Sequence, residues 1–338
     1  MKKQNENLGY LGSLDLLRGL ASLAVVFFHF THGNPNLLSK ENPLYIAGRY
    51  GFLGVDVFFV ISGFVIPYAM YRGRYQLSNF WKFLGKRFLR IEPPYLVSIF
   101  LVLILNFVST LSPYYRGTGF SIDFTALMLH LGYLNAFFDY PWYNDVYWTL
   151  AIEFQYYLLI ALLFPLLLNN NKLFSYMVLI SLGAIGFWID KHSLIFNYGL
   201  LFVAGILMFQ FRVGYISRQE FGLLMLVALI MIFIRFDKRY LIAALLPYFF
   251  IIYLNFNDKI SKFLGDISYS LYLVHIPVGG RMINLAENFL HTEFQRSLAV
   301  FVALGCSVVF AWLFYRFVEK PALLWSKKLS YQPEIASK

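Results

Sequence analysis

The chain has 338 residues, of which 59% are hydrophobic, 20% are aromatic and only 14% are charged. A water-soluble domain carries roughly a quarter charged residues because its surface faces water, so this composition excludes a soluble globule. The net charge of +10 does not indicate nucleic acid, because the basic residues lie in short segments between apolar runs and form no continuous basic face. We therefore expect a protein that is embedded in a membrane along its whole length.

Apolar runs of about 20 residues, the length that a helix needs to cross a bilayer, recur from one end of the chain to the other. They predict an all-α, polytopic membrane bundle of about ten transmembrane helices. The expected spans are 14–31, 52–71, 92–112, 146–168, 173–189, 195–210, 220–235, 239–256, 267–285 and 297–318. Because the loops are short, we expect residues 1–338 to form a single membrane domain with no appended soluble domain.

Segment 122–138 is apolar but short, and it contains His130, Gly132 and Asn135. Basic residues help to decide whether it spans, since they favour the cytoplasmic side of a membrane. Ten spans place both termini and most of the 28 Lys and Arg residues on that side, whereas an eleventh would move the Lys-rich C-terminus outside. We expect this segment to be re-entrant or to lie at the outer interface of a multi-pass protein of the inner or plasma membrane.

The first predicted span, LDLLRGLASLAVVFFHF, contains ionisable residues, which are costly in a membrane and usually mark a functional site. On a helix, Arg18 and His29 point within about 20° of one another and lie about 16 Å apart along the axis. Asp15 is close enough to hold the Arg18 guanidinium. Arg18 could instead extend to the lipid headgroups, and His29 could be a packing residue, so their alignment alone names no reaction.

Arg18, ten intervening residues and His29 resemble the first motif of the acyltransferase-3 family, membrane O-acyltransferases that modify surface polysaccharides and peptidoglycan. Five further stretches resemble the family in the same order: GVDVFFVISGFVI at 54–66, RFLRIEPPYL at 87–96, YWTLAIEFQYYLL at 147–159, SYSLYLVHIPV at 268–278 and YRFVEKPA at 315–322. The resemblance covers nearly the whole chain. It implies transfer of an acyl group, acetyl by default, from acetyl-CoA or another acyl-CoA, and we expect no metal.

Arg87 and Arg90 match the family's Arg-x-x-Arg element, which the resemblance connects with acyl-CoA. The residues agree with this interpretation, because residues 72–90 carry six basic side chains. Two arginines at i and i+3 share one face of a helix and can bind phosphate oxygens. Arg18 is a third candidate for the phosphates of the donor. The alternative is an ordinary basic loop on the cytoplasmic side.

Three further side chains lie near the expected outer ends of spans. Glu153 is the sole acid of its span; it could pair with His29 and raise the basicity of the imidazole, or form only an interhelical hydrogen bond. Trp148 could anchor the span at the interface or stack on a sugar. Asp56 could pair with His29, bind sugar hydroxyls or simply end its helix.

Ser270, Tyr272 and His275 form a polar cluster within the ninth predicted span. Polar groups in a span line either a substrate path or a seam of helix packing. The sequence leaves both alternatives open.

Together these features predict a membrane O-acyltransferase with His29, Arg18 and Glu153 as catalytic residues. His29 would act as general base or would carry the acyl group covalently. The expected acceptor is a cell-surface or lipid-linked glycan of the cell envelope, and a separate extracytoplasmic acyl-handling protein is a possible partner. The alternative is a proton-coupled secondary transporter, which buried Arg, His and Glu would also suit and which would act without CoA; a structural membrane subunit is a third class.

Overall fold

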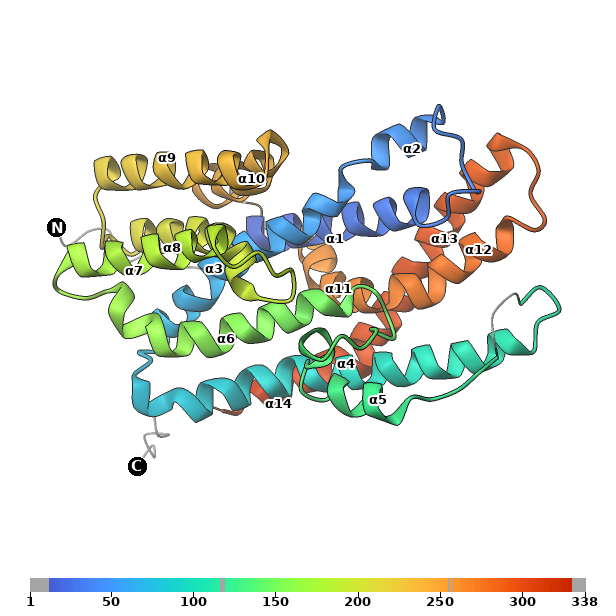
Figure 1. Cartoon of the computed structure of the whole chain (residues 1–338), viewed down its shortest axis with the longest axis horizontal. Coiled ribbons are helices and arrows are strands. Elements are labelled where there is room, and N and C mark those ends of the chain that lie inside the picture. The colour runs from blue at the N-terminus through green and yellow to red at the C-terminus, as the bar shows by residue number, and fades with distance from the viewer. Residues whose placement is uncertain (1–11, 116–118, 255, 257, 330–338) are drawn as a thin grey trace.

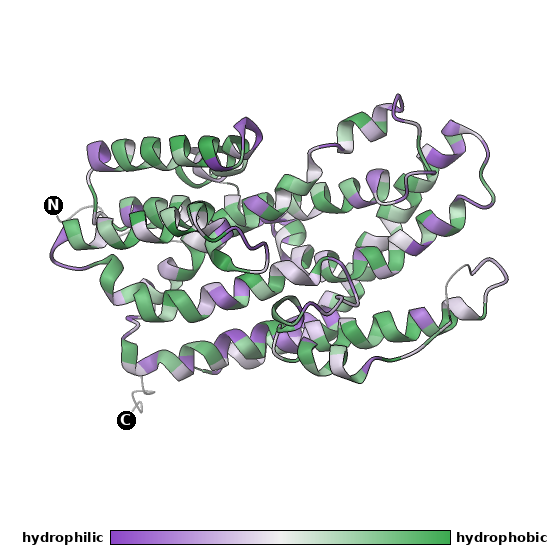
Figure 2. Ribbon diagram, in the orientation of Figure 1, coloured by the Kyte–Doolittle hydropathy of each residue, from purple (hydrophilic) through white to green (hydrophobic). Residues whose placement is uncertain are grey.

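The computed structural model describes residues 12–115, 119–254, 256 and 258–329. Within these residues every regular element is a helix, so the predicted all-α class is confirmed. Most of the long helices run roughly parallel to the long axis of the molecule (Figure 1). Figure 2 shows that hydrophobic residues cover most of the long helices and that hydrophilic residues gather at helix ends, in loops and along the first half of α4.

Each predicted span overlaps one of the longer helices. These helices are α1 (Gly12–His32), α3 (Gly54–Arg72), α4 (Phe80–Thr110), α6 (Tyr147–Leu167), α7 (Lys172–Ala184), α8 (Gly199–Arg212), α9 (Arg218–Arg235), α10 (Lys238–Tyr253), α11 (Lys259–His275) and α13 (Glu293–Phe314).

Shorter helices connect or extend the long ones. They are α2 (Pro43–Gly48), η1 (Gly51–Leu53), η2 (Leu77–Asn79), α5 (Phe124–His130), η3 (Asn135–Phe137), η4 (Ile185–Phe187), η5 (Ile195–Tyr198), η6 (Ile276–Gly280), α12 (Arg281–Ala286), η7 (Tyr315–Glu319) and α14 (Lys320–Lys327). The elements η6 and η7 are π-helical turns that continue α11 into α12 and α13 into α14.

The count of about ten spans is not confirmed. Among the described residues, six helical segments are long and apolar enough to cross a membrane: Gly12–His32, Pro43–Arg72, Leu77–Thr110, Tyr147–Leu167, Ile195–Arg212 and Glu293–Lys328. The other predicted spans form helices of 13 to 18 residues, mostly shorter than the roughly 20 residues that a perpendicular span needs. The longest of them, α9, also carries Arg218, Glu220 and Arg235.

Helix α4 begins at Phe80 rather than near residue 92. The basic stretch before Pro93 is therefore part of a helix and not a loop. Its apolar side chains explain this, since Phe83 is fully buried while Lys82 is exposed, which gives the stretch one face for the protein and one for the surroundings.

Segment 122–138 contains only the seven-residue helix α5 and the short turn η3. A helix of seven residues is about 10 Å long and cannot cross a bilayer. Side chains hold the irregular backbone of this segment and of the stretch that follows it. The Tyr143 backbone N–H donates to His130 Nε2 at 3.1 Å, and the Asn135 side-chain amide donates to the Pro141 carbonyl oxygen at 3.1 Å. Such internal partners are what non-helical backbone requires inside or beside a membrane.

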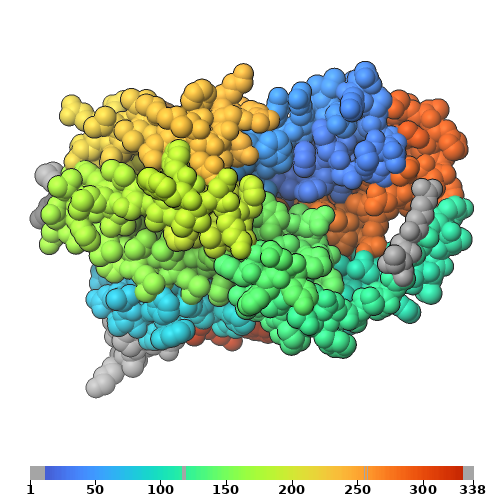
Figure 3. Space-filling model, in the orientation of Figure 1, coloured from blue at the N-terminus to red at the C-terminus, as the bar shows by residue number. Residues whose placement is uncertain are grey.

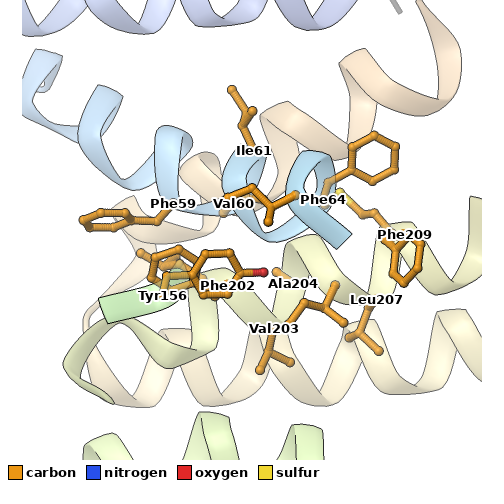
Figure 4. Packing of buried hydrophobic residues seen from close by; sticks show 14 of the residues in the cluster. Phe59, Val60, Ile61, Phe64, Tyr156, Phe202, Val203, Ala204, Leu207 and Phe209 are labelled. Atoms are coloured by element: carbon orange, nitrogen blue, oxygen red, sulfur yellow. The ribbon is translucent and has the colours of Figure 1, made fainter. Parts of the chain in front are cut away.

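Helices α3 and α8 pack with their backbones almost in contact. A Cβ on Gly205 of α8 would collide with the Val60 carbonyl oxygen of α3, and one on Gly63 would collide with the Phe202 carbonyl oxygen. Figure 4 shows the aromatic side chains around this approach, with the Phe59 ring of α3 packed against Phe202 of α8 at a centroid distance of 5.2 Å. Small residues at a helix crossing are typical of membrane bundles, where close van der Waals contact drives association.

A second close approach joins α1 to α11. A Cβ on Gly19 would meet Leu264, and one on Gly265 would meet Asp15. The Ser22 hydroxyl donates to the Ser268 carbonyl oxygen at 3.0 Å. The first and eleventh helices are thus fixed side by side although they are far apart in the sequence.

The loop after α1 is tied to the last third of the chain. The Asn34 amide donates to Asn284 Oδ1 at 3.1 Å and to Glu287 Oε2 at 2.9 Å, and the Asn42 amide donates to Glu293 Oε2 at 2.6 Å. Figure 3 shows the corresponding blue and orange segments in contact at one end of the molecule. These bonds close the bundle at that end.

We predict that Gly205→Leu destabilises the protein, because the new side chain would have to displace backbone atoms of α3. Overpacking of this kind costs about 1–3 kcal/mol or more. Gly305→Leu is the matched control, since a Cβ at that exposed position of α13 meets nothing within 4 Å. Thermal unfolding in detergent should show a lower Tm for Gly205→Leu only; equal Tm values would contradict the packing described above.

Candidate functional site

A cavity of about 110 Å³ lies between α1, α3, α4, α6, α11 and η7. Its charged lining consists of Arg18, Arg87, Arg90, Glu153 and Glu319, and we call it the arginine cavity. Three guanidinium groups face two carboxylates, so positive charge is in excess. Ionisable groups gathered inside a membrane bundle mark a site by their cost alone.

Arg18 reaches this cavity from α1. Its side chain is partly buried and lies within electrostatic range of Arg90, Glu319, Asp15 and Glu153. It therefore faces charges inside the bundle, and an extension to lipid headgroups is not what the structure shows.

Arg87 and Arg90 enter the same cavity from the first half of α4. The Arg87 guanidinium carbon lies 5.4 Å from the centre of the Phe83 ring and 5.5 Å from that of Tyr157. These cation–π contacts hold the planar group between two rings. Sequence spacing predicted a shared helix face for these two arginines, and the structure places Arg18, the third candidate, in the same cavity.

Glu153 lies on α6 in the arginine cavity. Its Oε1 accepts hydrogen bonds from the Tyr157 hydroxyl at 2.6 Å and from the Ser62 hydroxyl at 3.3 Å. The structure places this carboxylate with Arg18 rather than with His29, because the two residues line different cavities. The expected pair of Glu153 and His29 is therefore not formed.

Glu319 is a member of the cavity that the sequence did not single out. It sits in the π-turn η7 and is buried, and its Oε2 accepts hydrogen bonds from the Ser270 hydroxyl at 2.5 Å and the Ser270 backbone N–H at 3.1 Å. The only signal for it was its position in the YRFVEKPA stretch. Ser270, expected on a substrate path, holds Glu319 in place.

A second cavity of about 360 Å³ contains His29, and we call it the histidine cavity. Of its lining residues, Gly33, Asp145 and Asn284 are exposed, while Asn34 and Asn144 are buried. Most of its lining is polar; the polar side chains are His29, Asn34, Asn106, Tyr143, Asn144, Asp145, Arg281 and Asn284.

His29 and His275 lie side by side, with ring centroids 5.2 Å apart. This pair follows from the packing of α1 against α11. His275 is fully buried, and its Nδ1 donates to the backbone carbonyl oxygens of Leu271 and Tyr272 at 3.1 and 2.8 Å. A carbonyl oxygen can only accept, so Nδ1 carries a hydrogen, and in the neutral ring Nε2 is then an acceptor. This buried Nε2 has no hydrogen-bond partner among the described residues.

The carboxylate that acts electrostatically on His29 is that of Asp145. It lies just before α6, in the stretch that joins α5 to that helix, and lines the histidine cavity. Sequence reasoning missed it because an acidic residue in a loop is ordinary. Asp56, the other expected partner, lies in the first turn of α3 near Tyr198 and Tyr240 and lines neither cavity.

Tyr272 and Thr149 lie between the two sites. Both line the arginine cavity, and their hydroxyls are hydrogen-bonded at 2.8 Å. The Tyr272 ring centroid lies 6.0 Å from that of His275, which packs against His29. Arg18 and His29 thus occupy one helix but open into separate cavities, and Tyr272 forms part of the wall between them.

Trp148 does not line either cavity. Its ring packs on Tyr198, with centroids 5.6 Å apart, and against the edge of Phe59 at 6.5 Å. Of the side chains expected on a substrate path, Tyr272 is the one that lines either of these two cavities, while His275 packs beside His29.

The fold and these two cavities define a polytopic helical membrane protein with a charged site and a histidine site in its interior. A sequence model of the acyltransferase-3 family, described as an acyltransferase domain, matches residues 11–316. The chain therefore belongs to this acyltransferase family, as its motifs predicted. No solved structure matches the chain.

Several curated proteins are similar to the chain. "Putative O-acetyltransferase SAR0937" of Staphylococcus aureus strain MRSA252 is 27% identical over 387 residues, which cover 96% of this chain and 60% of the relative. The O-acetyltransferase OatA of Staphylococcus aureus strain NCTC 8325 is 30% identical over 198 residues, or 54% of this chain and 30% of that protein. The chain thus spans 60% of the length of the first of these relatives.

Proposed function

We propose that this protein is an O-acyltransferase, with acetyl as the default acyl group, that moves the group from cytoplasmic acyl-CoA to a hydroxyl of a cell-surface or lipid-linked glycan. One observation carries the proposal: a single helix, α1, presents Arg18 to a cluster of arginines and His29 to a second, polar cavity. Family membership supplies the acyltransferase class, and the names of the relatives favour O-acetyl transfer.

The arginine cavity suits the phosphates of the donor. Arg18, Arg87 and Arg90 offer guanidinium groups, which bind phosphate oxygens through paired N–H donors. Glu153 and Glu319 lie in the same cavity, where their carboxylates can offset the charge repulsion among the three arginines before the donor binds. On this proposal the side of the membrane with the arginine cavity is the cytoplasmic side, which agrees with the basic first half of α4.

The histidine cavity suits the transfer step. A rise of about 16 Å separates Arg18 from His29 along α1, which is comparable to the reach of the pantetheine arm of CoA. His29 takes the proton of the acceptor hydroxyl, the hydroxyl oxygen attacks the thioester carbonyl carbon, and the carbon–sulfur bond breaks. The departing thiolate of CoA takes up the proton from His29.

A covalent variant uses the same residue. The His29 ring nitrogen attacks the thioester carbonyl carbon, and CoA leaves as its thiolate as the carbon–sulfur bond breaks. The acceptor hydroxyl then attacks the acylated imidazole, which leaves as free His29, and the hydroxyl proton passes to the released thiolate. Asp145 stabilises positive charge on the ring in either variant, since a nearby carboxylate favours the imidazolium. In both variants the wall at Tyr272 and Thr149 has to open for the thioester to reach His29.

We predict that His29→Ala abolishes acyl transfer, with a loss of about 10²–10⁴-fold or more, because general acid–base groups contribute that much. His291→Ala, at an exposed position, is the control and should leave the rate unchanged. The assay follows labelled acetyl from acetyl-CoA into glycan in proteoliposomes, with mass spectrometry of surface glycans from expressing cells as a second readout.

Normal acetylation by His29→Ala would refute the proposed role of this residue. Movement of glycan or protons in the absence of CoA would instead identify a transporter.

We also predict that Arg90→Gln raises the KM for acetyl-CoA by about 10–100-fold, because a hydrogen bond to a charged group contributes about 1.5–3 kcal/mol. Lys82→Gln removes the same charge from an exposed position of the same helix and should change KM little. Equal changes in the two variants would show that general surface charge, and not the cavity, attracts the donor.

A further inference from the structure

Arg281 is a charged group in the histidine cavity that the proposed transfer step does not use. It begins α12, directly after the π-turn η6 that follows His275. Turns of this kind often occur at functional sites because they re-aim the side chains that follow. The Arg281 side chain is partly buried and lines the same cavity as His29.

Within the described residues, the hydrogen bonds of Arg281 are all with neutral groups. One terminal nitrogen donates to the Ser109 hydroxyl and the other to Asn106 Oδ1, both on α4. None of the ion pairs among the described residues includes Arg281. A partly buried guanidinium normally has a carboxylate or phosphate partner, since an unpaired buried charge is costly.

The hydrogen-bonding capacity of Arg281 is also incomplete. A guanidinium has five N–H donors, and two of the donors have partners in Ser109 and Asn106. The Nε atom is buried and has no acceptor in the part of the chain that the structure describes. The two contacts to α4 fix the plane of the group, and the side chain lines the histidine cavity in that orientation.

The remaining lining fits a sugar. Asn34, Asn106, Asn144 and Asn284 line the cavity, and amide side chains can donate to and accept from sugar hydroxyls. The volume of about 360 Å³ lies at the small end of the range for small-molecule pockets. Asn34 is itself held by Asn284 and Glu287, which keeps this part of the lining in place.

We infer that the histidine cavity is the acceptor site and that Arg281 selects glycans with an anionic group, a carboxylate or a phosphate, close to the hydroxyl that is acylated. This rests on the proposed function and adds the chemical class of the acceptor. The anion binds Arg281, the asparagine amides bind sugar hydroxyls, and the accepting hydroxyl lies at His29. Asp145 keeps the anion away from His29 by charge repulsion, which sets the direction of the bound sugar.

Binding tests this inference without acyl transfer. The full chain in phosphatidylcholine nanodiscs, without CoA, is titrated with two matched pairs: methyl glucuronide with methyl glucoside, and glucose 6-phosphate with glucose. Saturation-transfer NMR measures each affinity. We expect at least one anionic sugar to bind about 10–100-fold more tightly than its neutral twin.

Variants assign the preference to its residue. Arg281→Gln should abolish the preference and leave neutral sugar binding unchanged, and Arg281→Lys should keep part of it. Arg296→Gln is the control, because Arg296 lies on α13, contacts the Leu290 and Asn36 carbonyl oxygens and does not line the cavity. A thermal unfolding curve for each variant separates loss of binding from loss of fold.

Several results would overturn the inference. It would be contradicted if each anionic sugar bound no more tightly than its neutral counterpart, or if neither anionic sugar bound. It would also be contradicted if the preference for the anionic sugar persisted in Arg281→Gln. Competition by CoA would assign Arg281 to the donor, and loss of the preference only in nanodiscs with anionic lipid would assign it to a lipid headgroup. If the anionic sugars bind as expected but no acyl transfer occurs, the sugar site is supported and the proposed function is refuted. If acyl transfer occurs equally well to anionic and neutral sugars, the proposed function is supported and the role of Arg281 is refuted.

Discussion

The close packing of α1 against α11 is the contact on which the rest of the site depends. Gly19 and Gly265 leave no room for a side chain at this crossing, and Ser22 is hydrogen-bonded to the Ser268 carbonyl oxygen. Because the helices are fixed so closely, His29 meets His275 three turns further along. The same register brings Arg18 into the cavity that Ser268, Tyr269 and Tyr272 line.

The fold was largely predictable from the sequence, because apolar runs and helix caps are local signals. Helices α9 and α13 each begin with a capping box. The side chains of the N-cap residues Ser217 and Thr292 accept hydrogen bonds from the backbone N–H three residues further on, and the Glu220 and Gln295 side chains accept from the backbone N–H of the N-cap residue. The number of spans was less predictable. Helices such as α7 are only 13 residues long, and hydropathy alone does not tell a short span from a helix packed inside the bundle.

The candidate site was predictable in part. The charge of Arg18 inside a predicted span and the spacing of Arg87 and Arg90 identified these three residues. The structure places all three in one cavity. Partners from distant segments were not predictable, since no spacing rule relates Arg281 to Asn106 or Asp145 to His29. For the same reason Glu153 was matched with the wrong partner. The position of the hydrogen on the His275 ring could also not be predicted, because it follows from the backbone carbonyl oxygens of α11 that accept from Nδ1.

A photoreactive donor tests the central claim most directly, namely that acyl-CoA bound at the arginine cavity delivers its acyl group along α1 to His29. The chain would be labelled with an acyl-CoA that carries a diazirine on its acyl chain, and the modified residues would be identified by mass spectrometry. The account predicts labels at His29 and at the residues between the two cavities, such as Tyr272 and His275. It also predicts that these labels are lost in the Arg87→Gln and Arg90→Gln variants. Labels confined to lipid-facing residues, or labels at His29 that do not depend on these arginines, would contradict it.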